Sequence, residues 1–229
     1  MVEFALSQGK SDIFVVHADR HAERVGADAI EQAALEAGAN VLGVQSFSYS
    51  QQGVLAAIPG IASSFLAYGA DTIFVTSGSD GALPWLADLL PEHGIDRATA
   101  QFISLQRLDA QSGTLSLKGL QGAWFATPAP VLAQQFNRRY GEAYGSQPNL
   151  IASLAYDGIA AIGALVAEGK SNALRADALT QPAGFAGVNG PFRLLSNGTN
   201  ERGLAVAQVE NNQVIVIDPA PTSFGSAGF

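Results

Sequence analysis

The sequence predicts an α/β protein built on a parallel β-sheet that is flanked by helices. Three observations support this fold class. Short apolar runs alternate with amphipathic stretches from about residue 12 to residue 127. The apolar runs lack the polar alternation of half-exposed strands, which is typical of strands buried on both faces. Glycines stand where helices should end and turns should begin.

The alternating part of the chain gives the elements in order. Strands are predicted over 12–17, 41–47, 72–76, 99–105 and 122–127, and helices over 20–37, 54–68 and 82–93. Gly38 follows the first helix at the position of a left-handed C-cap. Pro59 lies inside the second helix, and we expect it to break or kink that helix because proline lacks a backbone donor.

The pattern changes after residue 127. Helices are predicted from Pro130 to residue 144 and over 150–166, and the second of these is apolar on nearly every side. Strands are predicted over 191–195, 203–210 and 214–218, with hairpin turns at Asn197-Gly198 and Asn211-Asn212. The two helices need a sheet to lie on, and we expect that sheet in a segment before residue 1. Unless that segment or another copy covers them, the two helices should expose apolar surface, so we expect oligomerisation or strand exchange.

The composition excludes several classes of function. The 229-residue chain has a net charge of −8, so we predict no nucleic-acid partner. It has no cysteine, which excludes disulfides, thiolate metal sites and a cysteine nucleophile. Neither a G-x-G-x-x-G nor a G-x-x-x-x-G-K-[ST] motif is present, and we predict no cofactor. The sequence contains no signal peptide and no uninterrupted apolar run of membrane-spanning length, so an export signal, if used, lies outside it.

Several short motifs resemble one family of binding proteins. They are Arg138-Arg-Tyr-Gly-Glu-Ala-Tyr-Gly145, Gln147-Pro148, Ala155-Tyr-Asp-Gly158, Gly187-Val-Asn-Gly190 with Phe192-Arg193, Ser196-Asn-Gly198 and Glu201-Arg-Gly-Leu204. They resemble the type I periplasmic binding proteins, which include the branched-chain amino-acid receptors of ABC transporters. Within that superfamily, Trp124-Phe-Ala-Thr-Pro128, Glu201-Arg-Gly-Leu-Ala205 and Asp218-Pro-Ala-Pro221 are similar to the penicillin-binding-protein activators, envelope lipoproteins that regulate peptidoglycan synthases.

The resemblance implies a two-lobed α/β fold. Residues 10–120 would form the second lobe with its sheet, 128–186 would be helices of the first lobe, and 187–229 would return to the second lobe as a β-hairpin. Part of the first lobe would then be missing at the N-terminus.

The resemblance also implies a non-enzymatic envelope protein that regulates peptidoglycan synthesis by contact with a peptidoglycan synthase. The alternative is an ABC-transporter solute-binding protein that takes an amino acid or a similar small polar ligand and meets the transporter's membrane component. Either protein would be periplasmic, with a lipid anchor outside this sequence.

In solute-binding relatives, loops at the carboxyl ends of the strands hold the ligand. The resemblance gives as ligand-binding candidates His21, Ser77, Gly78, Ser79, Gln106 and Asp109 in such loops, and Tyr156 on the apolar helix. Three of these positions depart from the family's pattern. His21 stands in place of a tyrosine and Ser79 in place of an aromatic residue. Gln106 lies near the position of an acidic residue that binds the ammonium group of an amino-acid ligand. These departures weaken the interpretation as an amino-acid receptor.

Some of these residues also fit a metal site or a catalytic site. His17, Asp19 and His21 form a metal-ligand pattern, but we favour a polar loop in which Asp19 caps the next helix. Ser77 and Ser79 lack a G-x-S-x-G elbow, so we favour loop or ligand contacts over catalysis and predict no enzyme.

For Asp157 and the two tryptophans we predict structural roles. We expect Asp157 to bind backbone amides of a neighbouring loop rather than a ligand, because a buried carboxylate must find donors. We expect Trp85 and Trp124 to pack in the core or at the edge of a lobe.

Overall fold

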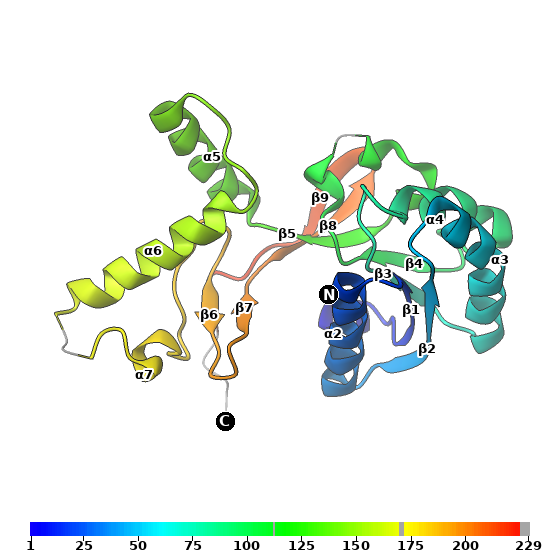
Figure 1. Cartoon of the computed structure of the whole chain (residues 1–229), viewed down its shortest axis with the longest axis horizontal. Coiled ribbons are helices and arrows are strands. Elements are labelled where there is room, and N and C mark those ends of the chain that lie inside the picture. Colours follow the sequence, from blue (N-terminus) through cyan, green and yellow to red (C-terminus); the bar gives the residue numbers. More distant parts are fainter. Residues whose placement is uncertain (112, 170–171, 225–229) are drawn as a thin grey trace. The chain divides into compact units, whose positions relative to one another are not determined.

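A computed structural model describes residues 1–111, 113–169 and 172–224 (Figure 1). The chain divides into two compact units. The first, called here the sheet unit, consists of residues 1–126 and 206–217. The second, the helical unit, consists of residues 127–205 and the chain from residue 218 onward. The polypeptide therefore passes between the units three times.

The sheet unit is built on a sheet in which seven strands of the described chain lie in the order β2-β1-β3-β4-β5-β8-β9. The strands are β1 (Asp12–Ala18), β2 (Asn40–Phe47), β3 (Thr72–Val75), β4 (Gln101–Ser104), β5 (Trp124–Thr127), β8 (Ala205–Glu210) and β9 (Gln213–Asp218). β1 to β5 run parallel to one another. The predicted α/β class with a mainly parallel sheet is thus confirmed.

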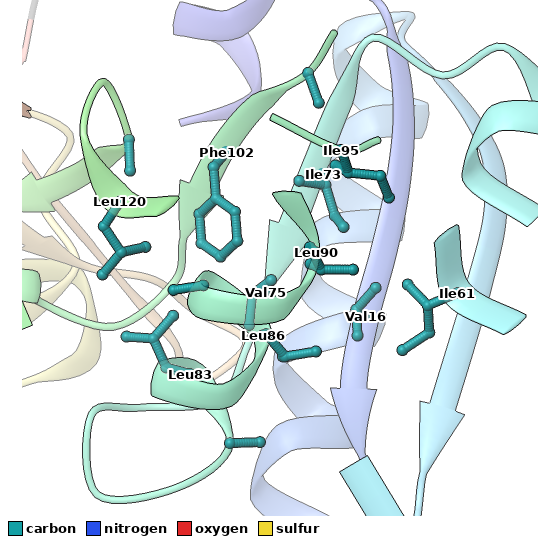
Figure 2. Packing of buried hydrophobic residues seen from close by; sticks show 14 of the residues in the cluster. Val16, Ile61, Ile73, Val75, Leu83, Leu86, Leu90, Ile95, Phe102 and Leu120 are labelled. Atoms are coloured by element: carbon teal, nitrogen blue, oxygen red, sulfur yellow. The ribbon is translucent and has the colours of Figure 1, made fainter. Parts of the chain in front are cut away.

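Helices cover both faces of this sheet, so the central strands are buried on both sides. α1 (Val2–Ser7) and α2 (His21–Ala37) pack against Ile13, Val15 and Phe74. α3 (Gln51–Tyr68) and α4 (Leu83–Leu89) pack against Phe14 and the other residues of the opposite face. Figure 2 shows part of this second core: Val16, Ile61, Ile73, Val75, Leu83, Leu86, Leu90, Ile95, Phe102 and Leu120. The result is a three-layer unit with a core on each side of the sheet.

Two local predictions meet different outcomes. Gly38 has a φ of 78° and ends α2 in the left-handed conformation, as predicted. Pro59, however, does not break α3, which runs without interruption from Gln51 to Tyr68. The helix buries Ile58 and Ile61 on either side of the proline, and this packing offsets the one backbone hydrogen bond that proline cannot donate.

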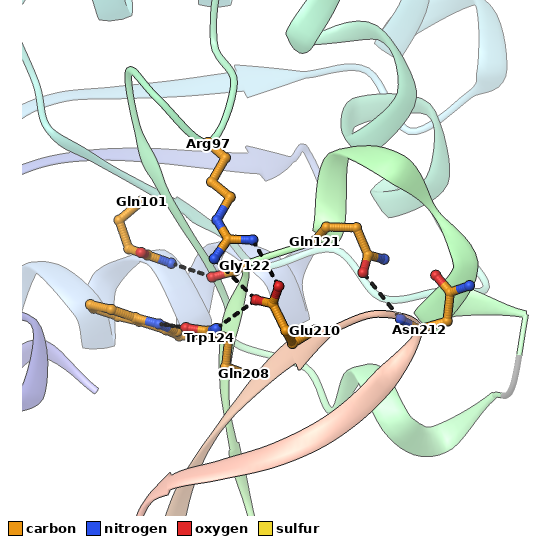
Figure 3. A network of polar contacts seen from close by, with 8 residues as sticks. All are labelled: Arg97, Gln101, Gln121, Gly122, Trp124, Gln208, Glu210 and Asn212. Carbon is orange, nitrogen blue, oxygen red and sulfur yellow. Dashed lines mark hydrogen bonds and ion pairs between the residues drawn. The ribbon is translucent and has the colours of Figure 1, made fainter.

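A polar network closes the end of the sheet where the β8–β9 hairpin joins β5 (Figure 3). Asn211 and Asn212 both have positive φ, 52° and 62°, as a tight two-residue hairpin turn requires. The backbone N–H of Asn212 donates to Gln121 Oε1 at 3.1 Å. Trp124 Nε1 donates to Gln208 Oε1 at 3.0 Å, so this tryptophan packs in the sheet unit as expected.

The helical unit contains α5 (Pro130–Tyr144), α6 (Ala152–Ala167), α7 (Ala176–Leu179) and the antiparallel strands β6 (Phe192–Leu194) and β7 (Asn200–Arg202). α1, α7 and β7 were not predicted, because each is too short to show a periodic pattern. Short 3-10 turns over Pro91–His93, Leu108–Ala110, Thr114–Ser116 and Lys118–Leu120 belong to the sheet unit. Within the described residues, no helix is long and apolar enough to cross a membrane.

Asp157 ties α6 to the β6–β7 hairpin. Its carboxylate is 1% exposed, accepts a hydrogen bond from the Val188 backbone N–H at 2.7 Å and pairs with the guanidinium of Arg202. Asn189 Nδ2 donates to Ser153 Oγ at 2.7 Å and adds a second tie. Asp157 therefore binds a loop amide, as predicted. Residues 187–205 thus lie within the helical unit.

The outer side of α6 is apolar and open to solvent. Ile159 is 71% exposed, and Leu154, Ile162 and Val166 are exposed as well. Gly158 and Gly163 have no heavy atom within 4 Å of the position that a Cβ would take. The apolar surface expected on these helices is thus present in the structure.

Candidate ligand-binding site

The candidate site lies where parallel strands of the sheet unit end. β1 is followed by β2 on one side of it and then by β3 on the other side, so the chain reverses direction across the sheet at β1 and β3. Loops at the carboxyl ends of strands diverge at such a point and leave room for a ligand. The segments there are residues 18–23, 76–80 and 105–109, which lie at the ends of β1, β3 and β4 and include the first turn of α2; we call them the carboxyl edge.

Glu23 joins two of these loops. Its Oε2 atom accepts hydrogen bonds from the Ala18 backbone N–H at 2.7 Å, from Ser77 Oγ at 2.5 Å and from Thr76 Oγ1 at 3.3 Å. Ser77 is fully buried, so its hydroxyl is already satisfied by the protein. Sequence reasoning missed Glu23. The available signal was an acidic side chain in the first turn of the helix after β1, where carboxylates are favoured.

Gly78 brings the second and third loops together. A Cβ at this position would lie 3.5 Å from Gln106 Cγ and 3.0 Å from Asp80 Oδ1. The Asp80 carboxylate therefore also lies close to Gly78. Ser79 is partly exposed beside it, and Gln106 is exposed. Gly78, Ser79 and Gln106 thus form an accessible polar surface.

Arg107 and Asp109 form a bidentate ion pair in the loop after β4. Arg107 Nε lies 2.9 Å from Asp109 Oδ1, and Nη2 lies 2.7 Å from Oδ2. The Gln106 backbone N–H donates to Ser104 Oγ at 3.2 Å and holds the start of the loop. The fork geometry fixes both side chains, so this loop offers a preset pair of charges and one neutral amide.

The loop after β1 differs from the expectation in one respect. Arg20, not Asp19, is the N-cap residue of α2, and no side chain caps the helix there. Asp19 forms a surface ion pair with Arg24 at 3.6 Å instead, because that charge is one turn further along the helix. His21 begins α2 and is exposed, whereas His17 is buried with Nδ1 2.9 Å from the Ala18 carbonyl oxygen.

Two alternative interpretations of these residues are a metal site and a catalytic serine. No three His, Asp or Glu side chains of residues 1–111, 113–169 and 172–224 are grouped so as to hold a metal ion. The hydroxyl of Ser77 donates to Glu23 and not to a histidine.

Tyr156 belongs to the helical unit, unlike the other six candidates. It is 51% exposed and lines an apolar cavity of about 570 Å³ between α5 and α6. Its ring meets Phe136 edge-on at 5.4 Å, and the rings of Tyr140 and Tyr144 continue the row along α5.

The sequence profile of one family, described as "Periplasmic binding protein", matches residues 1–213. The chain belongs to the periplasmic binding proteins. This family implies a periplasmic location, and its members are described as binding proteins. No curated protein sequence matches the chain.

Solved structures of periplasmic binding proteins share the fold. One, described as a branched-chain amino acid ABC transporter from Rhodospirillum rubrum, has 19% identity and a TM-score of 0.76, over 94% of this chain and 63% of its own. A leucine binding protein from Thermotoga maritima has 18% identity and a TM-score of 0.65, over 96% and 63%. A solute binding protein from R. palustris in complex with benzoate has 15% identity and a TM-score of 0.64, over 98% and 62%. The chain thus spans less than two thirds of the length of these structures.

Proposed function

We propose that the protein is a solute-binding protein of ABC-type transport and that the carboxyl edge of the sheet unit supplies one wall of its ligand site. The observation that carries this proposal is the convergence of Gly78, Ser79 and Gln106 at the reversal point of a parallel sheet. A small polar ligand fits this surface, because Ser79 offers a hydroxyl, Gln106 a neutral amide and the neighbouring Arg107–Asp109 pair a fixed pair of charges, rather than a nucleophile and a base.

The comparisons with solved structures support a small-molecule ligand, but they do not identify the ligand of this chain. The matched structures include a leucine binding protein and a benzoate complex, so proteins of this fold accept small carboxylates. In our proposal the ligand-bound protein meets the membrane component of a transporter. The lobe assignment from the sequence, with residues 10–120 in the second lobe, stays part of this proposal.

Calorimetry of the whole chain against a panel of amino acids and aromatic carboxylates tests the proposal. We expect at least one saturable titration, and a loss of about tenfold in affinity in Gln106→Ala, because an unpaired ligand group costs about 1.4 kcal/mol. Gln32→Ala, on the exposed side of α2, is the matched control and should bind like the wild type. A flat response across the panel would count against a solute-binding role.

A second candidate function has its own supporting observation. Ser77 is engaged by Glu23, and the uncharged Gln106 stands where an ammonium-binding acid is expected, which favours a protein without a small ligand. In that case the protein would be a lipid-anchored regulator that contacts a peptidoglycan synthase. A pull-down with purified synthase separates the two: capture together with flat calorimetry would favour the regulator.

A further inference from the structure

A small cavity opens beside the carboxyl edge, between the loop that follows β2 and the loop that precedes α4. It has a volume of about 200 Å³, and its walls include Tyr49, Ser50, Asp80, Gly81 and Trp85. This volume lies below the ~300–1,000 Å³ of most small-molecule sites, so only a compact ligand fits. We call it the aromatic cavity.

Local structure fixes both aromatic walls. Ser50 caps α3 by accepting the Gly53 backbone N–H at 2.9 Å, and this sets the position of Tyr49 just before the helix. A Cβ on Gly81 would lie 3.8 Å from the Tyr49 ring, so the ring rests on the backbone there. On α4, Leu83 and Leu86 are fully buried, whereas Trp85 between them is 39% exposed and faces the cavity.

The charge of the cavity favours a cation. Asp80 lines it, and within the described chain this carboxylate has neither a hydrogen-bond donor nor an ion-pair partner. No lysine or arginine is found among the described residues that form the walls. The net charge of −8 attracts cations toward the protein as a whole.

Arg20 shows that the Tyr49 ring attracts a cation. The guanidinium carbon of Arg20 lies 4.1 Å from the centroid of that ring, within the range of a cation–π contact. It also places a positive charge close to the cavity, where it opposes a second cation. The affinity of the cavity for a cation should therefore rise when Arg20 is neutralised.

We propose that the aromatic cavity binds a compact organic cation of the quaternary ammonium class, with Asp80 as the counter-charge and Tyr49 and Trp85 as aromatic walls. Aromatic rings around a carboxylate suit such a cation because its charge is spread over methyl groups that contact the ring faces. The inference does not rest on the proposed transport role, since it concerns direct binding to this chain.

The test uses tetramethylammonium chloride as the probe, with saturation-transfer NMR on its methyl signal and sodium chloride as the ionic-strength control. We expect saturable binding to the wild-type chain. Choline should bind, and its neutral isostere 3,3-dimethylbutan-1-ol should bind at least about tenfold more weakly, because that isostere lacks the charge. No saturable binding, or equal binding of the isostere, would overturn the proposal.

Variants locate the site. Asp80→Asn should weaken tetramethylammonium binding about tenfold, and Trp85→Leu about fivefold, whereas Arg20→Gln should tighten it. Asp88→Asn, an exposed change of the same kind on α4, is the matched control and should have no effect. If Asp88→Asn weakened binding as much as Asp80→Asn, the effect would be general electrostatics, and the cavity would not be the site. Asp80 is exposed, so its variant decides the question even if Trp85→Leu fails to fold.

Discussion

The two units differ in how completely they bury their apolar residues. In the sheet unit, Phe14, Phe74 and Ile73 lie on strands with helices packed against both faces of the sheet. In the helical unit, α5 buries only Phe136 among its described residues, and α6 leaves Ile159 and its neighbours exposed. The sheet unit therefore buries its large apolar side chains within itself, whereas the helical unit leaves many of its apolar side chains exposed.

This difference shows which part of the fold holds the candidate site. The carboxyl edge is positioned by strands with two packed cores, which keep Glu23, Ser77 and Gln106 in place. In the helical unit, polar contacts such as the Asp157–Arg202 pair tie α6 to the β6–β7 hairpin. The predictions below test this contrast, from the largest effect to the smallest.

The largest effect is expected from a cavity in the sheet core. Phe14→Ala should lower the free energy of unfolding by about 3–5 kcal/mol, because it removes a fully buried ring. Ile159→Ala on α6 should change it by less than about 0.5 kcal/mol. Urea unfolding is followed by tryptophan fluorescence, which reports the sheet unit because Trp85 and Trp124 both lie there, and by circular dichroism, whose signal includes α6. Equal effects of the two changes would remove the contrast.

Asp157→Asn should destabilise the helical unit by about 3 kcal/mol. The change leaves the guanidinium of Arg202, whose side chain is only 15% exposed, without its counter-charge. On heating, circular dichroism should show a first loss of helical signal, from α5 and α6, before the tryptophan fluorescence of the sheet unit changes. Asp177→Asn, on the exposed side of α7, serves as the control. A single transition shared by both signals would mean that the units unfold together.

Glu23→Ala should cost about 1.5–3 kcal/mol in the stability of the sheet unit. The buried Ser77 hydroxyl and the Ala18 backbone N–H both lose their acceptor. Glu31→Ala, an exposed position on the same helix, should have little effect. Urea unfolding compares the two variants. If they matched, the hydrogen bonds of Glu23 would not hold the carboxyl edge.

The exposed side of α6 should matter more for association than for stability. We expect the wild-type chain to self-associate with rising concentration, and Ile159→Gln with Ile162→Gln to reduce this, because the apolar surface shrinks. Light scattering over a concentration series measures the change. Glutamine replacements at the exposed Val25 and Leu35 on α2 are the control. A wild-type chain that stays monomeric would contradict this prediction.

The smallest effect concerns acid pH. The hydrogen bond from Arg97 holds the pKa of Glu210 below its ordinary value of 4.5 (Figure 3). A lowered pKa in the folded state gives stability that is present above pH 4.5 and is lost as the pH falls through the folded pKa. Glu210→Gln should therefore flatten the loss of stability below pH 4.5, measured by urea unfolding over a pH series. An unchanged pH profile would show that the pair contributes nothing.

The sequence predicted the strands of the sheet unit well because their apolar runs are buried on both faces, as the run from Asp12 to His17 shows. It also predicted the Asp157 contact, because a buried carboxylate on an apolar helix needs hydrogen-bond donors. It did not predict the continuity of α3 through Pro59 or the role of Glu23. Both depend on contacts between segments distant in sequence, such as the 54 positions between Glu23 and Ser77. A local pattern can mark Glu23 as a first-turn carboxylate, but it does not show which distant residues that side chain contacts.

Hydrogen exchange with mass spectrometry on the wild-type chain tests the central contrast most directly. Amides of β1 and β3 should exchange only through global unfolding of the sheet unit, because both strands are fully enclosed. Amides of α6 should exchange orders of magnitude faster through local opening, since one side of the helix lacks packing. This difference between residues 72–75 and 152–167 is the result that we predict. Equal protection of the two segments at low protein concentration, where the chain is monomeric, would contradict the account.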